Sequence, residues 1–210
     1  AFIVGKSGNL EWIGHPMAID SPLQAVVAGT WDLNRAREAM VAEQKLKAAI
    51  ERGDMNGAMR SAQELTTLFP DSFDHAMTQV ELLIRSEKFA EANTAAAVAL
   101  KTCQSNPASL NSLAWLLATG TDSTQVDLNV ARSAARLAAD LTQEKDSSVL
   151  DTLARVTARS GDLAAAIELQ KKAISLETSE SQAELLATLQ EYELALNKAR
   201  LTSENVPTDG

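Results

Sequence analysis

The stretch Leu150–Leu176, LDTLARVTARSGDLAAAIELQKKAISL, predicts two helices joined by a tight turn. In its first half, apolar and small residues recur three, four and seven positions apart, which is the period of one helix face. The turn follows from Gly161, which suits the left-handed conformation at a helix end, and from Asp162, which suits the cap of the next helix. Such a hairpin has apolar surface on more than one side. It therefore needs copies of itself as neighbours to bury that surface.

Copies of this hairpin recur along the chain. In each, an alanine of the second helix follows an acidic or glycine-rich turn: these are Ala58, Ala92, Ala131 and Ala166, separated by 34, 39 and 35 residues. The longest interval is explained by about five additional residues in the loop 119–124. Most residues four and seven positions after each alanine are also small. In this spacing the chain resembles the tetratricopeptide repeat family over roughly residues 36–200.

The resemblance implies an all-α fold, a right-handed superhelix of about four helix pairs plus a capping helix. The pairs are expected at 32–52 with 56–69, 72–86 with 89–102, 108–118 with 128–141, and 147–160 with 163–176. A solitary helix at about 180–200 would cover the open end of the array. Residues 201–210 are expected to form a disordered tail.

Residues 1–31 differ in kind from the repeats. Ala1–Val4 and Asn9–Ile13 predict a β-hairpin, and Ser21-Pro22 predicts the start of a short helix that ends near Ala28. The sequence stretches AFIVGKSGNLEWIGHPM and AGTWD resemble the last part of a thioredoxin-like domain of the redoxin type. This resemblance implies that residues 1–31 are the C-terminal remnant of that domain, fused to repeats at 32–200. The family's cis-proline and two catalytic cysteines would then precede residue 1.

Because the chain opens within a strand and without Met, we expect it to be a fragment of a longer protein. The redoxin resemblance favours a bacterial extracytoplasmic, periplasmic location for that protein. A hairpin that has lost its sheet has an exposed edge and is marginally stable alone. We therefore expect it to pack on the first long helix through Phe2, Ile3 and Trp12, or to pair with another copy of the chain.

Composition excludes several functions. The net charge of −9 disfavours nucleic acid and anionic membrane surfaces as partners, and no apolar run approaches the ~20 residues of a membrane helix. His15, His75 and Cys103 lie in different segments without metal-ligand spacing, and no glycine-rich phosphate loop is present. We therefore predict no catalytic residue, no metal ligand and no cofactor within this chain.

Cys103 has two interpretations. It is a catalytic thiol whose pKa is lowered by the nearby Lys101, or a half-buried thiol that packs like a small apolar residue. In either case the chain alone should not exchange disulfides, because exchange needs an attacking and a resolving thiol.

The first helix of each tetratricopeptide pair lines the concave face of the array. Transferring the inward positions by register predicts partner-binding residues at Met77, Glu81, Arg85, Asn111, Trp115, Asp151, Arg155 and Arg159. Tryptophan is enriched among binding hot spots, although Trp115 also fits a core position between repeats. The arginines suit a carboxylate ligand, although a solvated helix face also explains them.

The sequence thus predicts a protein-interaction module that binds a protein or peptide in its concave groove and recruits it to a redox domain. The alternative is a structural scaffold or a homodimerisation module without a peptide ligand. Catalysis by Cys103 is the third hypothesis.

Overall fold

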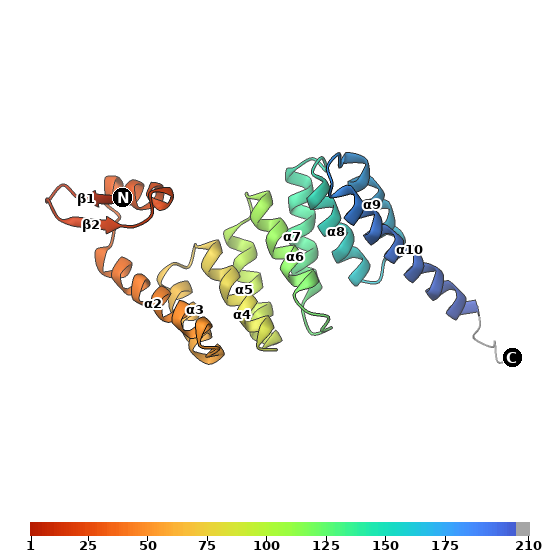
Figure 1. Cartoon of the computed structure of the whole chain (residues 1–210), viewed down its shortest axis with the longest axis horizontal. Helices are drawn as coiled ribbons and strands as arrows, with labels where there is room; N and C mark the ends of the chain where they lie inside the picture. The colour runs from red at the N-terminus through yellow and green to blue at the C-terminus, as the bar shows by residue number, and fades with distance from the viewer. Residues whose placement is uncertain (205–210) are drawn as a thin grey trace. The chain divides into compact units, whose positions relative to one another are not determined.

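Pairs of antiparallel helices make up most of the protein, as Figure 1 shows. The structure is a computed structural model that describes residues 1–204, apart from the side chains of residues 21, 203 and 204. The chain separates into two compact units, Ala1–Pro70 and Asp71–Gly210.

The first unit contains a hairpin and one helix pair. Its elements are β1 (Phe2–Val4), β2 (Leu10–Ile13), the 3₁₀ turn η1 (Pro16–Ala18), α1 (Asp20–Ala28), α2 (Leu33–Glu51) and α3 (Met55–Leu68). The predicted order of strand, turn, strand and helix is therefore confirmed. The predicted start at Ser21-Pro22 is slightly late, because α1 already begins at Asp20; its N-cap residue, Ile19, makes no side-chain hydrogen bond.

The hairpin is held from one side only. Ile3 is buried and pairs in register with Trp12, whereas Phe2 is 67% exposed, so the predicted packing on the first long helix through Phe2 is wrong, and pairing with another copy of the chain stays a prediction. The indole of Trp31 donates a hydrogen bond to the carbonyl oxygen of Glu11 at 3.0 Å. This bond ties the connection between α1 and α2 to strand β2. The Trp12 ring also covers Gly14 so closely that a Cβ there would lie 2.4 Å from a ring carbon.

The second unit contains three helix pairs and a last helix. They are α4 (Phe73–Arg85) with α5 (Phe89–Thr102), α6 (Pro107–Thr119) with α7 (Leu128–Leu141), α8 (Ser147–Arg159) with α9 (Leu163–Leu176), and α10 (Gln182–Glu204). The bounds of the paired helices agree with the predicted ones to within one residue. The last helix is longer than predicted and includes the first four residues of the expected tail; residues 205–210 lie outside the described residues.

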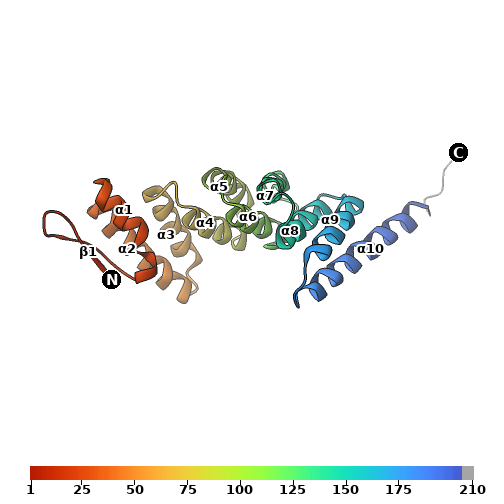
Figure 2. The ribbon, with the colours of Figure 1, turned by 90° about the horizontal axis from the view of Figure 1, so that it is seen from above.

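The four repeat alanines occupy equivalent positions. Each is the fourth residue of a 14-residue second helix, and each is at most 1% exposed: Ala58, Ala92, Ala131 and Ala166. A methyl side chain at this position lets the second helix approach its own first helix closely. Figure 2 shows these pairs from a second direction. The predicted all-α arrangement of tetratricopeptide-like helix pairs is therefore confirmed.

Local chemistry starts and stops these helices. Asp162 accepts a hydrogen bond from the backbone N–H of Ala165, and Gly161 has a φ of 93°, as the turn pattern predicts. The long loop after α6 is fixed by Asn93 on α5. Its side chain donates to the carbonyl oxygen of Gln125 at 2.9 Å and accepts from the N–H of Asp127 at 2.8 Å. Across residues 1–204, every helix is too short or too polar to cross a membrane.

Candidate functional site

The exposed Trp115 on α6 and the half-buried Arg155 on α8 form an aromatic–cation pair. The guanidinium carbon of Arg155 lies 5.0 Å from the centroid of the Trp115 ring, within the range of a cation–π contact. Arg155 Nη2 also donates to Thr188 Oγ1 on α10 at 3.3 Å. The ring remains 41% exposed, so Trp115 is not the core tryptophan of the alternative interpretation. Side chains of three helices thus meet at one surface.

A buried glutamine links the helices that carry this surface. Gln170 on α9 is fully buried, and its amide nitrogen donates to Asp151 Oδ1 at 2.8 Å and to the carbonyl oxygen of Leu185 at 3.2 Å. These bonds connect α8, α9 and α10. We call Trp115, Asp151, Arg155, Gln170, Thr188 and Tyr192 together the tryptophan cluster.

Several buried polar atoms in and beside the cluster lack a hydrogen-bond partner among the described residues. They are the hydroxyl oxygen of Tyr192, Nε of Arg155, Oε1 of Gln170 and, one helical turn before Trp115, Oδ1 of Asn111. A buried polar group without a partner costs about 1–3 kcal/mol. The cluster therefore has unused capacity both to donate and to accept hydrogen bonds.

Tyr192 is held in its neutral form. The pKa of its phenol is raised to about 12, chiefly by burial; the positive charge of Arg155 acts in the opposite direction, and the nearby Asp151 and Glu191 contribute smaller increases. At neutral pH the hydroxyl therefore keeps its proton and can act as a donor.

The other predicted partner-binding residues lie elsewhere. On α4, Glu81 and Arg85 form an exposed ion pair at 2.7 Å, and Met77 is half-buried one turn earlier. Of the eight predicted residues, the structure gathers Trp115, Asp151 and Arg155 in the tryptophan cluster.

Arg159 has an internal role that its register did not predict. Its Nη1 donates to the carbonyl oxygens of Leu117 and Ala118 at 3.1 and 2.9 Å, and its Nη2 donates to that of Ser123 at 3.2 Å. The guanidinium thus holds the C-terminal end of α6 and the loop that follows. A partner carboxylate would have to displace these bonds, so we remove Arg159 from the candidate site.

The repeat register did not predict three members of the cluster as partner-binding residues: Gln170, Thr188 and Tyr192. One of them leaves a sequence signal. Gln170 stands where the earlier second helices have Ala62, Ala96 and Ala135, so a long polar side chain replaces a repeat alanine. Thr188 and Tyr192 belong to the last helix, which has no repeat counterpart from which to transfer a position.

Cys103 does not resemble a reactive thiol. Its side chain is 3% exposed, and Sγ contacts the carbonyl oxygen of Leu100 at 3.6 Å. Burial raises the pKa of the thiol, which contradicts the interpretation that Lys101 lowers it and agrees with the interpretation of Cys103 as a packed thiol. Within residues 1–204, no three side chains of the His, Cys, Asp and Glu types gather as metal ligands would.

Comparison with known proteins finds similarity at the level of fold. No family model and no curated protein matches the chain. A crystal structure of MamA protein superposes with a TM-score of 0.50 at 15% identity, covering 82% of this chain and all of that one. PilF of Pseudomonas aeruginosa superposes with a TM-score of 0.50 at 19% identity, covering 84% of this chain and 80% of that one. At identities this low, the similarity shows the fold alone, which is all-α and tetratricopeptide-like.

Proposed function

We propose that this chain is a protein-interaction module that binds an extended polypeptide segment over the tryptophan cluster. The observation that carries this proposal is Trp115, which is 41% exposed and yet held in place by Arg155. Ordering long side chains costs free energy during association. Trp115 and Arg155 already order each other in the unbound chain, so binding loses less side-chain entropy.

The chemistry of the cluster favours a segment with an apolar or aromatic side chain. Such a side chain would cover the exposed part of the indole, since aromatic surfaces gain from burial beyond their area. The backbone amides on either side of it supply both donors and acceptors. The guanidinium of Arg155, which is half-buried and lies over the ring, is a donor that the carbonyl oxygens of such a segment could reach. The residues of α4, namely Met77, Glu81 and Arg85, would then contact the more distant part of a long ligand.

Residues 1–31 are, in this proposal, the C-terminal part of a thioredoxin-like domain, and the repeats bring a polypeptide to that domain. The order of β1, β2 and α1 supports this assignment, as does the glycine at position 14, directly after β2 and beneath Trp12. With Cys103 as its one thiol, the chain alone should give no turnover in an insulin-reduction assay. A CxxC encoded upstream of Ala1 would support the redox assignment, and turnover by these 210 residues would contradict the expected inactivity of the chain alone.

Peptide selection tests the binding proposal. The immobilised chain is used to select from a displayed library of random peptides, and the selected peptides are measured by calorimetry. Trp115→Ala is expected to weaken binding by about 30-fold or more, as for a hot spot worth ~2 kcal/mol. Leu141→Ala is the matched control, because Leu141 on α7 is 45% exposed and outside the cluster. The scaffold alternative predicts that no peptide is captured, and equal binding by the Trp115 variant would reject the assigned site.

A further inference from the structure

Helix α10 is covered on one side only. It has 23 residues against 14 in α9, its main neighbour, which corresponds to about 34 Å against about 21 Å at ~1.5 Å per residue. Leu185 and Tyr192 of α10 pack into the core with α9. Figures 1 and 2 both show the C-terminal part of α10 continuing past α9.

The opposite side of α10 has a strip of leucines in solvent. Leu186, Leu194 and Leu201 are 43%, 69% and 60% exposed. Leu186 stands eight residues before Leu194, and Leu201 stands seven after it. Each interval is close to two helical turns, so the three side chains share one side of the helix. We call this strip the α10 leucines. Thr188 and Tyr192, which belong to the tryptophan cluster, lie on another side.

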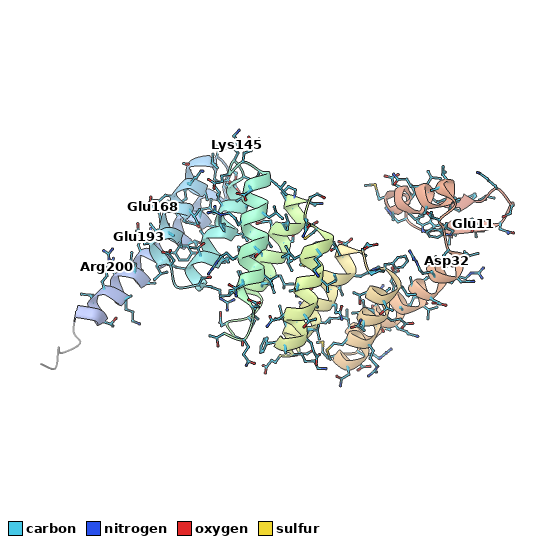
Figure 3. The ribbon with its side chains drawn as sticks, turned by 180° about the vertical axis from the view of Figure 1, so that it is seen from behind. Glu11, Asp32, Lys145, Glu168, Glu193 and Arg200 are labelled. Atoms are coloured by element: carbon cyan, nitrogen blue, oxygen red, sulfur yellow. The ribbon has the colours of Figure 1, made fainter. Side chains whose placement is uncertain are left out.

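A pocket lies beside this strip. This pocket, of about 430 Å³, lies between α9 and α10, with Ile167 and Leu196 among its apolar walls. Glu168, Glu193 and Arg200 line it as well, and Figure 3 shows them along the two helices. Within residues 71–204, each of the first helices α4, α6 and α8 is covered by a second helix. In this part of the chain α10 packs against α9 but has no second helix of its own after it, so its open side has the surroundings in which this fold packs another helix.

We propose that this occupant is α10 of a second copy of the chain, packed antiparallel about a two-fold axis at Leu194. A two-fold interface brings the same patch of both subunits together. The nearly equal spacing of the α10 leucines satisfies this condition. Leu194 would meet Leu194 of the partner subunit, and Leu186 would meet Leu201 of the partner subunit.

The charges on α10 favour this orientation. Glu191 stands three residues before Leu194, and Lys198 stands four residues after it; both are exposed. Their spacing of seven residues, about two helical turns, places them on the same flank of the leucine strip. In the antiparallel pair, Glu191 therefore lies at the level of Lys198 of the partner subunit, and this ion pair occurs twice. A parallel pair would place each side chain at the level of its own like charge, which is unfavourable.

Sedimentation velocity over a concentration series tests the first part of this proposal. The full chain is expected to dimerise, and Leu194→Glu to weaken the dimer at least tenfold, because the axis places two new charges against each other. Leu141→Glu on α7, which starts from a lower but substantial exposure of 45%, should leave the dimer unchanged. Circular dichroism checks that each variant keeps its helices. A chain that stays monomeric, or a dimer unaffected by Leu194→Glu, would overturn the proposal.

Charge reversal tests the orientation. Glu191→Lys and Lys198→Glu should each weaken the dimer, since each creates two like-charge contacts. The double variant restores two opposite-charge contacts and should recover the original dissociation constant to within about threefold. Failure of this rescue would reject the antiparallel register. Peptide binding at Trp115 is measured separately, so either proposal can fail without the other.

Discussion

Nη1 of Arg159 lies 2.9 Å from the carbonyl oxygen of Ala118, so a side chain of α8 caps the C-terminal end of α6. A cation at this end of a helix meets the negative end of the helix dipole. We predict that Arg159→Ala lowers the free energy of unfolding by about 1–3 kcal/mol, because carbonyls of α6 and of the following loop lose a charged donor. Urea unfolding measures the change.

We expect that lysine at position 159 cannot restore the stability that Arg159 provides. Its single ammonium cannot span the three carbonyl oxygens that the guanidinium reaches, so Arg159→Lys should remain destabilised by more than half of the alanine effect. Arg132→Ala, at an exposed position of α7, is the control and should change little. If Arg159→Lys were as stable as the natural chain, a specific guanidinium cap would be excluded.

Glu87 adopts a backbone conformation that favours glycine. Its φ is 56°, and it occupies the turn position held by Gly53 and Gly161 in two other repeats. A non-glycine residue in this region costs about 1 kcal/mol or more. Glu87→Gly is therefore expected to stabilise the chain by about 0.5–1 kcal/mol after the greater flexibility of the unfolded chain is counted. The thermal midpoint should rise.

The reverse change provides the control. Gly161→Ala, where φ is 93°, should lower the thermal midpoint, although nothing lies within 4 Å of the added methyl group. Strain in the backbone is then the cause rather than a clash. Opposite shifts for these two variants are the expected pattern, and a fall in midpoint for Glu87→Gly would be inconsistent with it.

The repeats were predictable because burial of small residues leaves a periodic trace. Ala92 and Ala131 sit in equivalent positions although the interval between them is 39 residues, since the surplus is confined to one loop. That loop also explains why the repeat register could not predict the structural role of Arg159. Its carbonyl at Ser123 lies where Arg159 can reach it, so a residue at a ligand position became a structural one.

The tryptophan cluster was predictable only in part for a related reason. Trp115 and Arg155 follow the repeat register, and the structure brings them together. Thr188 and Tyr192 come from α10, whose register is set by packing against α9 rather than by a repeat. Their contribution therefore depends on contacts between residues far apart in sequence, which no local pattern encodes.

Cys103 should react slowly with thiol reagents. Burial restricts access to the sulfur and raises the pKa of the thiol, so both the accessible fraction and the thiolate fraction are small. With Ellman's reagent at pH 8, we expect reaction far slower than that of free cysteine. Addition of urea beyond the unfolding midpoint should make the two rates similar. Fast reaction in the folded chain would revive the catalytic hypothesis.

Glu177 links stability to pH at the connection between α9 and α10. Its Oε2 accepts a hydrogen bond from the hydroxyl of Ser147 at 2.7 Å, and its Oε1 accepts from the N–H groups of Thr178 and Ser179. These hydrogen bonds lower the pKa of the Glu177 carboxyl from 4.5 to about 2. The bond from Ser147 has the largest effect, and those from Ser179 follow. The charged form is thus favoured by folding.

The sign of the pH effect follows from this direction. Because the pKa is lower in the folded chain, the stabilisation is complete above about pH 4.5 and is lost as the pH falls towards about 2. Ser147→Ala should raise the pKa of Glu177 towards 4.5, as carboxyl carbon shifts in an NMR titration would show. Its thermal midpoint should lie below that of the natural chain at pH 6, and the gap should narrow as the pH falls from 4.5 to 2. Ser175→Ala, whose hydroxyl bonds to the carbonyl oxygen of Lys172 instead, should leave the Glu177 titration unchanged. A Glu177 pKa that is the same with and without Ser147 would show that the backbone donors alone hold the charge.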